Sequence, residues 1–173
     1  MSLSEGGVRR RLLLSAALLT AGLALGGCQV RPMYADSSPA RQKLMSVAVE
    51  PVSSRVAQQV RNQLIFLFYG GGMAPSESAY DLALNVRRAA IGVFVNSATN
   101  TATAGNMRVT VNYVLKDAKT QAVVKKGTRT AVAAYDQPSQ EFAKIRSARD
   151  AENRAARAAA DLVDQDIAGF LSR

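Results

Sequence analysis

Alternation of apolar and polar residues through the middle of the chain constrains the fold more than any other feature. From Tyr80 to Val86 the even-numbered residues are apolar, and a second alternating run covers 109–115. A third run, with a less clear phase, covers 122–135. A period of two places alternate side chains on opposite faces of a strand. Because the connections between the runs are short, we expect an antiparallel meander of three strands.

The first of these strands changes phase near its middle. Ile91, Val93 and Val95 are odd-numbered, whereas the apolar residues before them are even-numbered. A shift of one residue would turn every following side chain to the opposite face of the sheet. We therefore predict a β-bulge between Arg88 and Ala90.

A further strand is predicted before the meander, over 43–51. Met45, Val47 and Val49 alternate there with small or polar residues, and Pro51 ends the run. This strand would add a fourth member to the sheet.

Two helices are predicted. Ser53 and Ser54 are candidate N-caps for a helix whose apolar residues recur every three or four positions and which ends near Gly70. An alanine-rich helix follows from Ser139 onward; a coiled coil is the alternative, but it has few large apolar residues at heptad spacing. The predicted fold class is α+β, with a four-stranded, mostly antiparallel sheet, two helices on one face and the order β-α-β-β-β-α in a single domain over 43–173.

Composition excludes several kinds of chemistry. The 173 residues contain no His and one Cys, so the chain has no Ser-His-Asp triad, imidazole metal site, internal disulfide or CxxC pair. We expect no catalytic residues, no metal and no cofactor. Enzymes that use carboxylates, such as glycosidases, are the remaining alternative, and the available candidates are Asp81, Asp117 and Asp136.

The first 27 residues have the pattern of an export signal. Three arginines at 9–11 precede an apolar run over 12–25, which is too short to span a bilayer and has the length of a signal-peptide core. The run ends in Leu-Gly-Gly before Cys28, which resembles the lipobox of bacterial lipoproteins and implies cleavage and acylation at that cysteine. The alternatives are an ordinary buried thiol at Cys28 and, for the export route, a twin-arginine signal instead of the general one.

The residues after Cys28 give information about the membrane to which the protein is sorted. Gln29 stands where an Asp would favour retention in the inner membrane of enteric bacteria, so it resembles a signal for sorting to the outer membrane. Residues 28–42 contain two prolines and two adjacent serines and are interpreted as a lipidated tether.

The positive charge predicts an acidic partner. The chain has a net charge of +9, and without the leader the remaining 146 residues keep +7. Each basic residue is also consistent with an ordinary solvated charge at a strand edge, which discourages aggregation. Export argues against nucleic acid as the partner. The candidate anion-binding residues lie in or beside the predicted strands: Arg87, Arg88, Arg108, Lys116, Lys119, Lys125, Lys126 and Arg129.

Several short motifs resemble the lipopolysaccharide-assembly lipoproteins of the LptE family, especially its alphaproteobacterial branch. Residues 28–34 (CQVRPMY) are similar to the family opening C-G-F-R-P-L-Y, with Gln-Val in place of Gly-Phe. Residues 79–82 (AYDL) and 113–117 (YVLKD) follow in the family's order. The family's A-T-R is here Ala-Thr-Ala at 102–104, so no role for that arginine carries over. Other matches cover Tyr135, Asp136, 141–143, Asp150 and Ala151.

This resemblance implies an outer-membrane lipoprotein on the periplasmic side that lies inside the LptD β-barrel as a plug and helps place lipopolysaccharide (LPS) in the outer leaflet. The polar loop 97–106 is then a candidate for insertion into the barrel, the alternative being a plain hairpin loop. A different class remains open, namely an accessory lipoprotein of another envelope transport or stress system.

Overall fold

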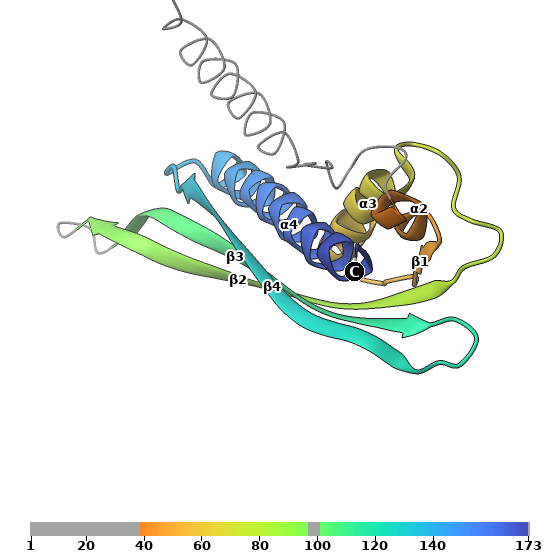
Figure 1. Cartoon of the computed structure of the whole chain (residues 1–173). Coiled ribbons are helices and arrows are strands. Elements are labelled where there is room, and N and C mark those ends of the chain that lie inside the picture. Colours follow the sequence, from red (N-terminus) through yellow and green to blue (C-terminus); the bar gives the residue numbers. More distant parts are fainter. Residues whose placement is uncertain (1–38, 97–100, 173) are drawn as a thin grey trace, which may run out of the picture. The chain divides into compact units, whose positions relative to one another are not determined.

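Three long strands form the predicted meander (Figure 1). The structure is a computed structural model that describes residues 39–96 and 101–172. In it, β2 (Tyr80–Asn96), β3 (Thr101–Asp117) and β4 (Val123–Asp136) pair antiparallel in sequence order. The predicted leader, Cys28, the tether residues up to 38 and the loop residues 97–100 lie outside the described residues.

A short parallel strand completes the sheet. β1 (Val47–Val49) pairs with the first three residues of β2, and the strand order is β1-β2-β3-β4. The prediction of a strand over 43–51 was wrong at both ends. Ala40 and Leu44 are buried four residues apart, so the chain before β1 forms the helix α2 (Pro39–Leu44), which takes in residues 39–42 of the predicted tether.

The crossover from β1 to β2 is the amphipathic helix α3 (Arg55–Tyr69). Its predicted ends are confirmed: the Ser54 hydroxyl accepts a hydrogen bond from the Ala57 N–H, and Gly70 adopts the left-handed conformation with φ of 61°. Its buried stripe packs toward the sheet and α4 and comprises Val56, Ala57, Val60, Leu64, Phe68 and Tyr69.

The long helix α4 (Glu141–Leu171) crosses the same face of the sheet as α3 (Figure 1). Small side chains let it approach the sheet and α3 closely, and its fully buried alanines are Ala151, Ala155, Ala156, Ala159, Ala160 and Ala168. The predicted α+β class is therefore confirmed, and the described elements follow the order α-β-α-β-β-β-α. Within the described residues, no helix is both long and apolar enough to cross a membrane.

The predicted bulge between Arg88 and Ala90 was wrong. The β2–β3 register runs without a shift from Tyr80 to Gly92, and the irregularities lie on either side of Phe94. Ile91 is 42% exposed, so neither face of β2 is deeply buried at this end, and the apolar pattern does not impose a register there. The polar stretch 96–106 was expected to be a turn or the start of the next strand, and residues 101–106 indeed belong to β3.

Candidate functional site

The helices of the described residues cover one face of the sheet, and none of them lies on the other face. Val109, Val111, Tyr113 and Leu115 of β3 are buried beneath α4, so their even-numbered neighbours point to the opposite side. The pairing register extends this division to β2 and β4. We call the uncovered side the outer face, and its polar residues include Asp81, Asn85, Arg87, Asn106, Arg108, Thr110, Asn112, Lys116, Lys126, Thr128, Thr130 and Asp136.

Four bases lie on the outer face. Arg87, Arg108 and Lys126 are exposed and Lys116 is half-buried, and none of the four forms an ion pair or side-chain hydrogen bond with a described residue. Arg87 is paired with Thr110 in the register, whereas Arg108 is two residues away on the same strand. Arg87 and Arg108 are therefore diagonal neighbours across the strand pair, a spacing that long side chains can bridge. Two uncompensated cations at this spacing favour an anion between them.

Hydroxyl and amide groups lie beside these bases. Thr110 Oγ1 and Thr130 Oγ1 are 3.1 Å apart, and the Thr128 hydroxyl donates to Asn112 Oδ1 at 2.7 Å. Sequence reasoning missed these residues, although the alternation that places Arg87 on the outer face also identifies them. They add neutral hydrogen-bonding groups to the charged ones.

Apolar side chains also reach the outer face at one end. Val132 is 51% exposed and is the register partner of Arg108, while Ile91 is paired with Asn106. This end of the outer face thus offers cations and exposed apolar surface together.

Three of the other predicted basic residues, Arg88, Lys125 and Arg129, belong to the covered face. Arg88 Nε lies 3.5 Å from Glu152 Oε2, and this glutamate also pairs with Arg55. Lys125 Nζ lies 3.2 Å from Asp166 Oδ1, and Arg129 Nη2 lies 2.7 Å from Asp166 Oδ2. The structure therefore divides seven of the eight predicted basic residues into four on the outer face without an ion pair to a described residue and three in ion pairs that tie the sheet to α4.

The Asp166 carboxylate also accepts a hydrogen bond from the Tyr113 hydroxyl. Burial raises the pKa of Asp166, but the hydrogen bonds from Tyr113 and Lys125 and the charges of Arg129 and Lys125 outweigh it, so the pKa lies below its usual value. The pKa of Tyr113 is raised mainly by burial, and the hydrogen bond to Asp166 raises it further. This cluster therefore links the sheet to α4 and stabilises their packing.

The three carboxylates considered for catalysis do not come together. Asp117 Oδ1 accepts hydrogen bonds from the backbone and hydroxyl of Thr120, which lower the pKa of Asp117, and it shapes the β3–β4 turn that also contains Lys119. Asp81 accepts from Ser78 and Gln121. Asp136 of β4 pairs with Ala104, near the end of β3 opposite to Asp117. Among the described residues, no group of three or more His, Cys, Asp or Glu side chains could hold a metal ion.

The described residues thus form an α+β domain with helices on one side of a four-stranded sheet and exposed basic and hydroxyl side chains on the other. The model of the lipopolysaccharide-assembly family LptE matches residues 44–166. The chain therefore belongs to the LptE family.

Solved structures of bacterial lipoproteins are similar to this chain in fold. A lipoprotein from Caulobacter crescentus is 28% identical over 76% of this chain and 95% of its own, with a TM-score of 0.61. Rare lipoprotein B from Shewanella oneidensis (15% identity, 72% and 92% coverage, TM-score 0.54) shares the fold. So does an uncharacterized lipoprotein B from Nitrosomonas europaea (13% identity, 72% and 82% coverage, TM-score 0.51). A search of curated proteins finds no match.

Proposed function

We propose that this chain is a non-enzymatic outer-membrane lipoprotein, acylated at Cys28, that assists LPS assembly as the partner and plug of an LptD-like β-barrel. The family match over residues 44–166 carries this proposal. The lipobox supports the anchor, and Gln29 supports the outer membrane as the location. Hydrogen bonds within turns already account for Asp81 and Asp117, which fits a role without catalysis.

The outer face supplies groups that suit LPS. Phosphate groups bind guanidinium and ammonium groups through charge-assisted hydrogen bonds, and Arg87 and Arg108 offer two guanidinium groups with hydroxyls beside them. Exposed Ile91 and Val132 provide nearby surface for acyl chains. We therefore propose that Arg87, Arg108 and Lys126 contact LPS, with an acidic barrel wall as the alternative. Arg88, Lys125 and Arg129 mainly stabilise the domain.

The barrel partnership predicts that the outer face touches protein in the cell. A photo-crosslinking residue at Arg87 should capture a large outer-membrane β-barrel protein or LPS. The same residue at Lys125 is the matched control, since that side chain turns toward α4 and pairs with Asp166. Crosslinking to a barrel from position 87 and not from position 125 supports the proposal. Adducts only with inner-membrane proteins would contradict it and favour an accessory role in another envelope system.

A further inference from the structure

The described part of the sheet has one edge partly covered by side chains and one edge left open. β1 ends at Val49 and covers only Tyr80 to Leu82, whereas β2 continues to Asn96. We propose that the open edge of β2 binds an extended acidic peptide segment of a partner protein, which adds a strand to the sheet where β1 stops. This site is separate from the outer face, so it extends the proposed function without depending on it.

One hydrogen bond shows which backbone N–H and C=O groups of β2 point to the open edge. The Glu50 N–H donates to Leu82 O at 2.9 Å, so Leu82 turns its polar backbone groups toward the β1 side. Alternate residues of a strand direct N–H and C=O to the same edge. The following alternate residues therefore also direct their backbone N–H and C=O groups toward the β1 side of the strand. These residues are Leu84, Val86, Arg88 and Ala90. No hydrogen bond from another described residue reaches these groups.

The opposite edge of the sheet is partly covered by side chains. Along β4, Ala134 O accepts a hydrogen bond from Arg154 Nη2 at 2.7 Å, and Asp136 O accepts one from the Ser147 hydroxyl at 2.7 Å. Thr128 O accepts one from Arg129 at 3.0 Å. Open edges are a liability that proteins usually cover or shorten. The difference between the two edges therefore marks the β2 edge as a place for a partner strand.

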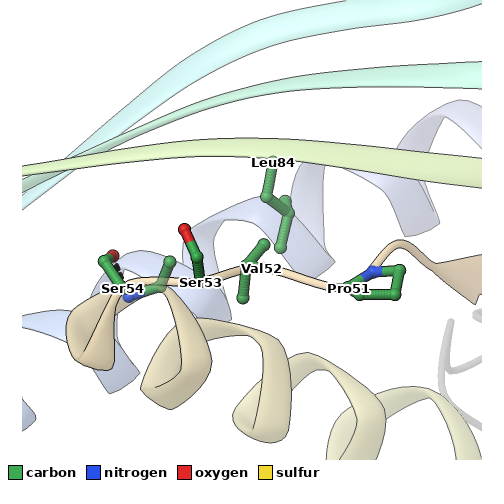
Figure 2. Close-up of a pocket in the computed structure, with 6 residues that line it drawn as sticks. Pro51, Val52, Ser53, Ser54 and Leu84 are labelled. Carbon is green, nitrogen blue, oxygen red and sulfur yellow. Dashed lines mark hydrogen bonds between the residues drawn. The ribbon is translucent and has the colours of Figure 1, made fainter.

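A hollow surface in two sections lies beside the open edge, past the end of β1. Its first section, about 500 Å³, is lined by Pro51–Ser54, Ala57 and Leu84, and Figure 2 shows Leu84 pointing toward Val52. The second section, about 320 Å³, shares Ser54 with the first and is lined by arginines. An added strand would cover both sections with its inward-facing side chains.

The second section carries an excess of positive charge. Arg55, Arg88 and Arg149 line it together with one carboxylate, Glu152, which pairs with Arg55 at 2.5 Å and Arg88 at 3.5 Å. Arg149 is exposed and has no ion pair with a described residue. Three guanidinium groups with one carboxylate favour a second acidic group from outside.

These two sections define the chemistry of the partner. Leu84 and Arg88 are four residues apart on the same face of β2, so the partner strand needs an apolar residue and an Asp or Glu four positions apart. A second copy of this chain is a poor occupant, because pairing two β2 edges would bring Arg87 and Arg88 of both copies together.

Amide hydrogen exchange of the whole chain with a synthetic peptide tests this proposal. The probe is the capped peptide Thr-Val-Thr-Val-Thr-Glu-Thr, and the controls replace Glu by Lys or methylate alternate backbone amides. We expect fast exchange at Leu84, Val86, Arg88 and Ala90 in the free chain, and at least about tenfold slower exchange with the probe alone. Arg149→Glu should weaken binding of the probe about tenfold, while the matched exposed control Arg157→Glu should leave it unchanged.

Three results would overturn the proposal. Equal protection by the methylated peptide would mean that no strand forms, and equal binding by Arg149→Glu would remove the acidic specificity. Protection of the four amides before any peptide is added would mean that this chain, or a second copy, already covers the edge; sedimentation would separate those two cases.

Discussion

At Asp166, one carboxylate of α4 meets three side chains of the sheet. Tyr113 and Arg129 bind Asp166 Oδ2, and Lys125 lies 3.2 Å from Oδ1. The two bases are partly exposed, so solvent screens part of their attraction. The Asp166 carboxylate neutralises the positive charges of Lys125 and Arg129, which face α4. These two residues were predicted to bind an external anion, but they pair with Asp166 of the same chain instead.

Asp166→Asn should therefore destabilise the domain by about 1–2 kcal/mol in urea unfolding. Because the folded pKa of Asp166 is lowered, its stabilisation is present above the unfolded pKa of about 4 and is lost as pH falls through the lower folded value. The loss of stability below about pH 4 should be shallower in the variant. The control Asp150→Asn removes an exposed pair with Arg154 and should cost less than about 0.5 kcal/mol. Equal losses in both variants would contradict this account.

Between elements, Gly127 of β4 provides the space for Tyr113 of β3. The two residues are register partners, and a Cβ on Gly127 would lie 2.6 Å from the tyrosine oxygen and 2.8 Å from Cζ. Gly127→Ala should displace the ring and destabilise the domain by about 1–3 kcal/mol. The control Gly169→Ala in α4 meets nothing within 4 Å and should stabilise by about 0.5–1 kcal/mol, measured by thermal unfolding. If Gly127→Ala leaves the thermal stability unchanged, the Tyr113 ring does not pack against Gly127.

Patterns within one element were predictable from the sequence, whereas contacts between elements were not. The caps Ser54 and Gly70 are local, and alternation of buried residues in β3 identifies its covered face directly. The bulge was misplaced because Ile91 lies where neither face is buried. The same reasoning could not separate Lys125 from Lys126, since only the register and the position of α4 show that Lys125 reaches Asp166.

For the whole molecule, the proposal requires an anchor outside the folded domain. Cys28→Ser removes the thiol that the lipobox predicts to be acylated, and acyl chains bind membranes with about 0.8 kcal/mol per buried CH₂. We expect the variant to leave the outer-membrane fraction and surface delivery of LPS to fall. Cell fractionation and surface LPS labelling measure the two effects. A variant that still fractionates with the outer membrane and delivers LPS normally would contradict the anchor.

The central claim is that the uncovered outer face of the sheet binds LPS. Binding of purified LPS to the whole chain tests it, using Arg87→Glu with Arg108→Glu against the control Lys144→Glu with Arg157→Glu, which makes the same change of net charge on exposed positions of α4. We expect the outer-face variant to bind at least about tenfold more weakly and the control to bind like the unaltered chain. Equal loss in both variants, or no loss in the first, would contradict the claim.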